Sequence, residues 1–150
     1  MLNSTEKITI AVGCDHAGYE LKCEIVKMLS ENGYACIDCG CGGESCHYPF
    51  HAEAVCDELL HHRAKFGLLF CGTGVGMMMC ASKHAGIRAM LASDPFSVSK
   101  SRGHNNANVL CLGGRVLSLE TAKELTMLFL TTEFEGGRHR ERIEMYDTII

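Results

Sequence analysis

The segment FGLLFCGTGVGMMMC, residues 66–80, decides how the whole chain is interpreted. Residues 66–71 are apolar or small without alternation, which predicts a strand buried on both faces, as in a parallel sheet. Glycines occupy every second position of the loop 72–76, and residues 75–84 are expected to form a helix. A buried strand, a glycine-rich loop and a helix in this order are typical of an α/β fold.

The rest of the chain repeats this alternation of strand and helix. Further buried strands are predicted at 8–14, 34–40, 86–92 and 108–114. Further helices are predicted to begin at Tyr19, Pro49, Pro95 and Ser118, and a C-terminal helix covers about 137–150. Such alternation predicts a five-stranded parallel sheet with helices on both faces. The length of 150 residues suits one domain, 1–150.

Composition limits the classes of function. The chain is 47% hydrophobic and 21% charged, as in globular domains, and its net charge of −4 disfavours nucleic-acid binding. We identify no signal peptide, and the longest weakly polar run, 66–81, is shorter than the ~20 apolar residues of a membrane span. Several of the ten cysteines occupy regular apolar patterns, which favours reduced thiols. We therefore expect a cytoplasmic protein without nucleic-acid or membrane partners.

Polar residues cluster around the predicted strands. In open parallel sheets, ligands bind beyond the carboxyl ends of the strands. The segments CDHAG (14–18), CGTGVG (71–76) and SRGHNN (101–106) come after the first, third and fourth strands along the chain. We therefore expect these three segments to gather at one edge of the sheet.

The segment CGTGVG is not a P-loop, because no Lys-Ser/Thr pair follows it, and a dinucleotide fingerprint belongs after the first strand. Its small residues let backbone N–H groups face a cavity, where they favour a phosphate, a carboxylate or a developing oxyanion. A tight turn that needs glycine sterically explains the segment equally well. Cys71 is either a buried filler or a thiolate acting as base or nucleophile, and its position favours the second interpretation.

Two further pairs of residues are candidates. Asp15 and His16 follow the first strand, where Asp15 also suits a helix cap. His104 and Asn105 precede the last strand. Because histidine titrates near neutral pH, His104 is a candidate acid or base.

Arg138 and Arg142 lie one helical turn apart and therefore project from the same face. Two guanidinium groups so placed form a phosphate clamp. Glu141 and Glu144 beside them indicate instead a solvated, salt-bridged helix, and the residues alone favour this second interpretation.

The stretch CIDCGCGGESCHYPFH, residues 36–51, is rich in soft ligands for zinc. These are Cys36, Cys39, Cys41, Cys46, His47 and His51. A closed zinc site usually has two well-spaced ligand pairs, whereas Cys36 lies within a predicted strand and the second pair lacks the usual spacing. We therefore predict no metal site, and leave open whether this loop binds metal incidentally or is sensitive to oxidation.

Six motifs occur in order between about residues 8 and 145: GCDHAG, YP, CGTGVG, SKHAGIRA, RGHNNANVL and EGGRHRERI. Together they resemble the type B ribose-5-phosphate isomerases, a family that shares a superfamily with the galactose-6-phosphate isomerase subunits. The resemblance implies a Rossmann-like three-layer α/β/α sandwich. It also implies an aldose–ketose isomerase that interconverts ribose 5-phosphate and ribulose 5-phosphate through an enediolate, without a metal or nucleotide cofactor.

The resemblance assigns roles to the candidate residues. Cys71 matches the base that moves a proton between C2 and C1, Thr73 assists proton movement on the oxygens, and His104 helps to open the furanose ring. The loop matching the anion hole contains Gly72, Gly74, Val75 and Gly76. The sugar-binding wall and the sugar hydroxyl ligands match Tyr48, Asp15 and Asn105. The phosphate ligands match His16, Arg115, Arg138 and Arg142.

The resemblance further implies a homodimer in which some of these arginines reach the partner's site, with a tetramer as an alternative. A phosphorylated substrate thereby gives the two cations of the C-terminal helix a purpose. His47 and Phe50 stand where the family more often has acidic or polar residues beside Tyr-Pro, which leaves the length of the sugar open. An isomerase of a six-carbon sugar phosphate is the first alternative, ahead of a non-catalytic Rossmann-type module and a zinc-dependent structural protein.

Overall fold

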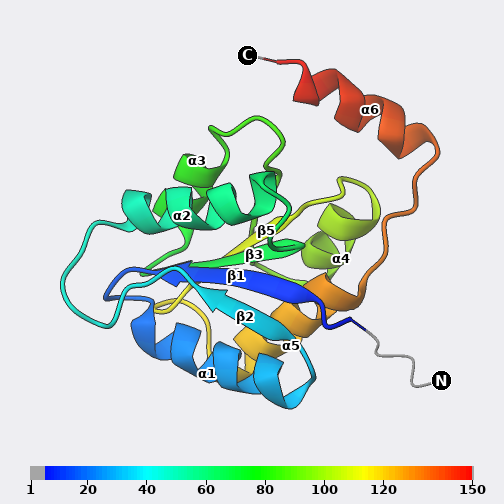
Figure 1. The fold of residues 1–150 in the computed structure, drawn as a ribbon. Helices are drawn as coiled ribbons and strands as arrows, with labels where there is room; N and C mark the ends of the chain where they lie inside the picture. Colours follow the sequence, from blue (N-terminus) through cyan, green and yellow to red (C-terminus); the bar gives the residue numbers. More distant parts are fainter. Residues whose placement is uncertain (1–5, 150) are drawn as a thin grey trace.

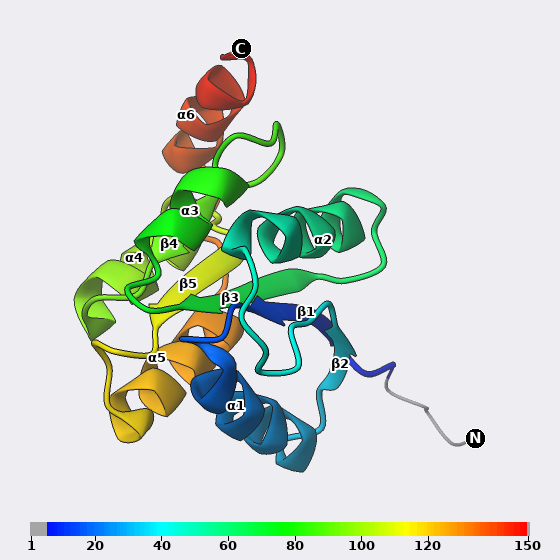
Figure 2. The same cartoon turned by 90° about the vertical axis from the view of Figure 1, so that its left-hand side faces the viewer.

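The computed structural model describes residues 6–149, in which a sheet lies between two layers of helices (Figure 1, Figure 2). The elements are β1 (Thr9–Cys14), α1 (Tyr19–Glu31), β2 (Ala35–Asp38), α2 (Tyr48–Leu60), β3 (Phe66–Cys71), α3 (Val75–Ala81), β4 (Ala89–Leu91), α4 (Pro95–Gly103), β5 (Val109–Gly113), α5 (Leu119–Thr131) and α6 (Arg138–Asp147). The strands are parallel and lie in the order β2-β1-β3-β5-β4. The predicted three-layer α/β/α sandwich with a five-stranded parallel sheet is confirmed.

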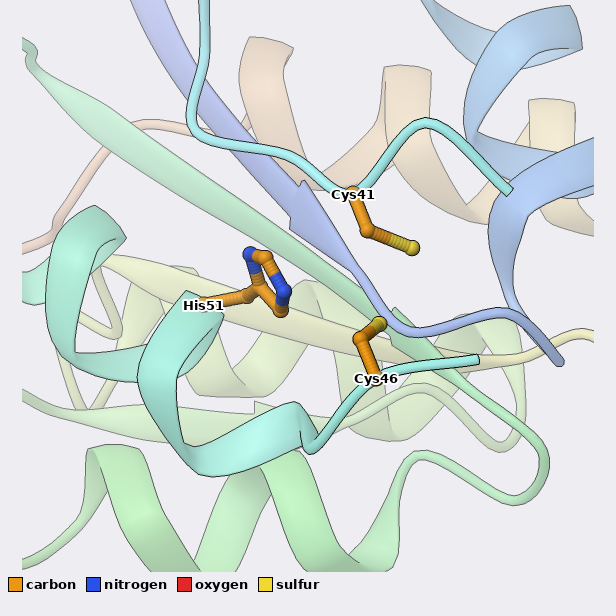
Figure 3. A group of neighbouring side chains, drawn as sticks. All are labelled: Cys41, Cys46 and His51. Carbon is orange, nitrogen blue, oxygen red and sulfur yellow. The ribbon is translucent and has the colours of Figure 1, made fainter. Parts of the chain in front are cut away.

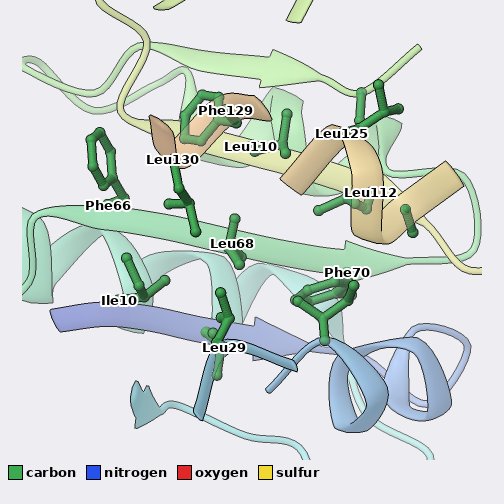
Figure 4. Packing of buried hydrophobic residues seen from close by; sticks show 14 of the residues in the cluster. Ile10, Leu29, Phe66, Leu68, Phe70, Leu110, Leu112, Leu125, Phe129 and Leu130 are labelled. Atoms are coloured by element: carbon green, nitrogen blue, oxygen red, sulfur yellow. The ribbon is translucent and has the colours of Figure 1, made fainter. Parts of the chain in front are cut away.

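Alternate residues of each central strand serve opposite faces of the sheet. Leu68 and Phe70 of β3 pack with the layer of α1, α4 and α5, whereas Leu69 and Cys71 pack with α2 and α3. Figure 4 shows the first of these layers, with Phe129 of α5 beside the sheet. Burial of one such leucine or phenylalanine stabilises the fold by about 1.5–3 kcal/mol. Because both faces are covered, the strand sequences are apolar throughout.

The predicted elements differ from the structure mainly at their ends. β4 comprises only Ala89–Leu91 instead of 86–92, because it is an edge strand that pairs with β5 alone and Gly86 before it has a positive φ of 85°. α3 ends at Ala81 rather than at position 84, and turns follow it. Within residues 6–149, no helix is long and apolar enough to cross a membrane.

The C-terminal helix α6 lies outside the three layers, beyond the amino ends of the strands (Figure 1). Ile143 is the buried residue of α6, and the helix is otherwise mostly exposed. At its C-terminal end, the Tyr146 hydroxyl donates to the Asn105 carbonyl over 3.5 Å, and Arg88 Nη1 lies 3.6 Å from Asp147 Oδ2. The helix therefore presents most of its surface away from its own chain.

Candidate active site

Cys71 is the last residue of β3 and points to the α2–α3 side of the sheet. It is buried, with 4% of its surface exposed. The backbone N–H of Gly74 donates a hydrogen bond to Cys71 Sγ over 3.1 Å. The sulfur is thus held as a hydrogen-bond acceptor at the point where the strand ends and the glycine-rich loop 72–76 begins.

The loop 72–76 passes close to other parts of the chain. Tyr48, the first residue of α2, lies across it, because a Cβ on Gly76 would approach Tyr48 Cζ to 2.6 Å. Thr73 is exposed, and its Oγ1 accepts a hydrogen bond from the Val75 N–H over 3.3 Å. The loop leads into α3 at Val75, and the first N–H groups of a helix lack partners within that helix. This end of the loop therefore favours negative charge.

The turn after β1 lies beside this loop. Asp15 Oδ1 accepts hydrogen bonds from the N–H groups of Ala17 (2.9 Å) and Gly18 (3.0 Å), and thus holds the turn before α1. The turn is tied to β3, because the Asp15 N–H donates to the Phe70 carbonyl over 3.1 Å. His16, the next residue, is exposed at the same edge.

Arg115, which follows β5, adds a cation to this edge. Its N–H donates to the Gly72 carbonyl over 2.9 Å, and its Cδ and Nη1 lie 3.5 Å from the position that a Cβ on Gly72 would take. The carboxyl edge of the sheet therefore brings together many of the predicted site residues. They are Asp15, His16, Tyr48, Cys71, Gly72, Thr73, Gly74, Val75, Gly76 and Arg115.

His104 and Asn105 lie at the opposite edge, so the prediction that the segment 101–106 gathers with Cys71 is wrong within one chain. Both residues follow α4, and the Asn108 carbonyl nearby accepts the N–H of Gly67 (2.9 Å), near the start of β3. Gly67 and Cys71 are four residues apart, which spans about 13 Å of strand. The reason is directional: the helix after a parallel strand returns the chain to the amino edge, and SRGHNN follows that helix rather than the strand.

Arg138 and Arg142 also lie away from Cys71. Both are exposed residues of α6, which stands beyond the amino ends of the strands (Figure 1). The predicted site residues therefore form two groups, one at each edge of the sheet. We call His104, Asn105, Arg138 and Arg142 the amino-edge group.

Two residues that sequence reasoning did not single out, Glu135 and His139, contact the amino-edge group. His104 Nε2 lies 2.9 Å from Glu135 Oε2, and the rings of His104 and His139 stack with their centroids 4.0 Å apart. Burial, and then the nearby charges of His104 and Arg138, lower the pKa of His139. Glu135 and His139 both belong to the motif EGGRHRERI. Their spacing of four residues was the sequence feature that could have indicated a contact between them.

The sequence matches the family described as Ribose/Galactose Isomerase over residues 10–146. The chain belongs to this isomerase family. Ribose-5-phosphate isomerase B of Escherichia coli (strain K12) is 45% identical over 141 residues, which cover 93% of this chain and 95% of that protein. D-erythrulose-4-phosphate isomerase of Pectobacterium atrosepticum is 37% identical over 91% of each chain.

Solved structures of the isomerase family have the same fold. A ribose 5-phosphate isomerase of Thermotoga maritima superposes with a TM-score of 0.93 at 41% identity, covering 96% of this chain and all of the other. Ribose-5-phosphate isomerase B of Clostridium thermocellum gives a TM-score of 0.93 at 39% identity, covering 95% and 97% of the two chains. The family resemblance of the sequence motifs is therefore confirmed at the level of fold and sequence.

In addition to the predicted isomerase residues, the loop between β2 and α2 and the first turn of α2 form a cluster of possible metal ligands (Figure 3). All ten cysteines are free, and Cys41, Cys46 and His51 place their ligand atoms within 4.8 Å of one another. Cys36 and Cys39, the C-x-x-C pair of the sequence, do not join this group because they serve opposite faces of the sheet. The folding of the loop against α2, and not a regular spacing in the sequence, brings these three ligands together.

Proposed function

We propose that the protein interconverts ribose 5-phosphate and ribulose 5-phosphate, with Cys71 as the general base. The observation that carries this proposal is the position of the Cys71 sulfur, at the carboxyl end of β3 and 3.1 Å from the Gly74 nitrogen. Membership of the isomerase family and the names of its relatives support the substrate class.

In this mechanism, the Cys71 thiolate removes the proton from C2 of the open-chain aldose. The electron pair of the C2–H bond becomes the C1=C2 double bond, and the carbonyl electrons move to the oxygen on C1. The N–H groups of the loop 72–76 stabilise this enediolate oxygen, where one such donor typically contributes about 3–4 kcal/mol. The thiol then returns the proton to C1 while the hydroxyl on C2 becomes a carbonyl, and Thr73 assists the transfer between the oxygens.

Ring opening and sugar binding need the remaining residues. We assign to His104 the transfer of the anomeric hydroxyl proton to the ring oxygen, which breaks the ring C–O bond. Asp15, Asn105 and Tyr48 contact the sugar, whereas the phosphate is held by His16, Arg115, Arg138 and Arg142. Phosphate binding far from C1 and C2 orients the reacting carbons against the base.

Because the amino-edge group lies at the opposite edge from Cys71 in one chain, we propose that the site is shared between two copies. His104, Asn105, Arg138 and Arg142 of one protomer then complete the Cys71 site of the other. The outward position of α6 supports this arrangement, since the exposed helix is available to a second chain (Figure 1). A homodimer would bring the two groups of residues together, and a tetramer would be a pair of such dimers.

The length of the sugar depends on the wall beside Tyr48. A family relative named for a four-carbon sugar phosphate indicates that the family accepts more than one chain length. His47 and Phe50, both exposed beside Tyr48, stand near the expected sugar wall. A six-carbon sugar phosphate is therefore the alternative substrate.

Many of the ten thiols lie in apolar surroundings and suit a reducing compartment, so we propose a cytoplasmic location.

Isomerase assays in EDTA test the proposal. Ribose 5-phosphate, ribulose 5-phosphate, erythrulose 4-phosphate and hexose 6-phosphates are offered to the wild type and to Cys71→Ala. We expect pentose isomerisation that falls about 10²–10⁴-fold in Cys71→Ala. The control is Cys56→Ala, which removes another buried thiol of the same core layer and should retain activity. Activity that survives Cys71→Ala, or a preference for hexose phosphates, would contradict the proposal.

A further inference from the structure

The loop that joins β2 to α2 carries a set of soft ligands to which the proposed isomerase mechanism assigns no role. Cys41 lies near the start of this loop, Cys46 near its end, and His51 in the first turns of α2. The two sulfur atoms and a ring nitrogen lie within 4.8 Å of one another (Figure 3). Tetrahedral zinc needs such atoms about 3.5–3.8 Å apart, as follows from Zn–S and Zn–N distances of about 2.3 and 2.1 Å. Small side-chain movements therefore suffice to bring the three ligand atoms to the separation that zinc requires.

The hydrogen bond of His51 prepares the ring for a metal. His51 Nδ1 lies 3.0 Å from the Cys39 carbonyl oxygen. A carbonyl only accepts, so Nδ1 carries the proton and Nε2 keeps its lone pair. Figure 3 shows one ring nitrogen directed toward Cys41 and Cys46 while the other points away. A histidine whose second nitrogen donates to a carbonyl is the usual arrangement around protein-bound zinc.

The backbone holds the Cys41 end of the loop in place. The Cys41 N–H donates to the Cys14 carbonyl over 2.9 Å, and the Cys14 N–H donates to the Gly40 carbonyl over 2.6 Å. Lys22 Nζ donates to the Cys41 carbonyl over 2.9 Å. Cys41 is only 3% exposed. Since His51 is fixed on a helix, two of the three ligands are already positioned in the folded chain.

Charge at the cluster is compatible with a divalent cation. Two thiolates balance the charge of Zn²⁺, and the nearby ammonium of Lys22 is compensated by the Asp38 carboxylate at 3.0 Å. Because zinc binds thiolates, the ion displaces the thiol protons of Cys41 and Cys46, so its affinity rises with pH.

We propose that Cys41, Cys46 and His51 bind one Zn²⁺ ion, with a water molecule in the fourth position. Two sulfur ligands and one imidazole select a borderline-soft cation over Mg²⁺ or Ca²⁺, which prefer oxygen ligands. The ion links the β2–α2 loop to α2, just before and after Tyr48. The ion thereby holds this loop against α2, and the proposed isomerase steps do not involve it.

Metal titration of the reduced full-length protein tests this site. After chelation and removal of the chelator under a non-thiol reductant, Zn²⁺ is titrated against a chromophoric competitor, and Co²⁺ is titrated for absorption. We expect one Zn²⁺ per chain at the cluster and a thiolate-to-cobalt charge-transfer band in the near ultraviolet. The second group of possible ligands, His104, Glu135 and His139, contains no sulfur and does not produce that band.

The variants Cys46→Ser and His51→Gln test the ligands, because both residues are partly exposed and their replacement spares the core. Each should weaken Zn²⁺ binding by more than about tenfold, since even outer partners of a metal ligand contribute that much. In Cys46→Ser the cobalt band should also weaken. Circular dichroism checks that the variants are folded.

The matched control is Cys36→Ser, which removes a half-buried thiol of the same segment that lies outside the cluster. It should leave the Zn²⁺ affinity and the cobalt band unchanged. The proposal is overturned if the reduced wild type binds no Zn²⁺ at mildly alkaline pH. It is equally overturned if Cys46→Ser binds as the wild type does, or if Cys36→Ser abolishes the band.

Discussion

Leu91 leaves no room for a side chain at Gly74: a Cβ at position 74 would lie 2.7 Å from Leu91 Cδ1. Gly74 also has a φ of 82°, a left-handed conformation that other residues rarely adopt. This same residue directs its N–H at Cys71 Sγ. The donor that faces the proposed base is therefore available only because position 74 is glycine.

Gly74→Ala should impair catalysis and stability together. The methyl group must displace Leu91 or rotate the peptide away from Cys71. Backbone strain of this kind costs about 1–3 kcal/mol of unfolding free energy. Loss of an oriented N–H donor should lower kcat by at least about tenfold, since removal of one anion-hole donor costs 10²–10³ elsewhere. Steady-state kinetics and denaturant unfolding measure the two effects.

Gly33→Ala is the matched control for this variant. Gly33 also has a positive φ, 84°, but nothing lies within 4 Å of the position that its Cβ would take. Its replacement should therefore cost about 1–2 kcal/mol from backbone conformation alone and leave kcat unchanged. Full activity in Gly74→Ala, or an equal loss in Gly33→Ala, would show that the N–H of Gly74 is not part of the site.

The carboxyl-edge part of the site was predictable because it depends on local sequence. The apolar run before Cys71 predicts a buried strand, and in a parallel sheet the end of that strand lies at the ligand-binding edge. Asp15 follows β1 in the same way, and β1 pairs directly with β3. Two local patterns and one topological rule therefore suffice to place these residues together.

The amino-edge group was not predictable by the same rule. His104 follows a helix rather than a strand, and the direction reversal by α4 carries it to the other edge. Its contact with Glu135 joins residues that are 31 positions apart along the chain, with no periodic pattern to reveal it. The C-x-x-C pair is separated for a reason that the sequence pattern does reveal: residues three apart in an extended chain point in opposite directions, and Cys36 and Cys39 pack on opposite faces of the sheet.

Mixing two inactive variants tests whether the site is shared. In a dimer of Cys71→Ala with His104→Ala, one site combines the intact Cys71 of one chain with the intact His104 of the other. Co-refolding the two variants in equal amounts should therefore restore about a quarter of wild-type activity, because half of the dimers are mixed and each has one intact site.

The control for complementation is a mixture of two Cys71 variants, Cys71→Ala and Cys71→Ser, in which no combination restores a complete site. Its activity should stay at the level of the separate variants. If the mixture of Cys71→Ala and His104→Ala also stays at that level while light scattering shows dimers, His104 acts on Cys71 of its own chain or not at all.

Arginines of α6 should control substrate affinity. Arg138→Gln and Arg142→Gln each remove a charged donor proposed to bind phosphate, and such hydrogen bonds contribute about 1.5–3 kcal/mol. We expect KM for ribose 5-phosphate to rise about 10–100-fold, with a smaller effect on kcat. Arg140→Gln is the control, because Arg140 stacks on Phe134 at 5.4 Å and has no assigned contact with the substrate. An equal effect of all three substitutions would indicate general charge attraction instead of a phosphate clamp.

Acid should destabilise the contact between α6 and the turn after α4. Burial and the positive charges of His104 and Arg138 lower the pKa of His139, while Glu135 opposes this shift. An unfolded histidine has a pKa of about 6.5, so the folded state binds fewer protons around this pH. The stability that comes from neutral His139 is therefore present above that value and is lost as the pH falls through the lower folded pKa.

Thermal unfolding between about pH 7 and pH 5 checks this linkage. The melting temperature of the wild type should fall more steeply than that of His139→Gln, which removes the titrating group. His62→Gln replaces an exposed histidine that is not part of the stacked pair and should keep the wild-type slope. A slope that is the same in His139→Gln and the wild type would mean that protonation of His139 does not weaken the fold, and that its stacking on His104 tolerates a charge.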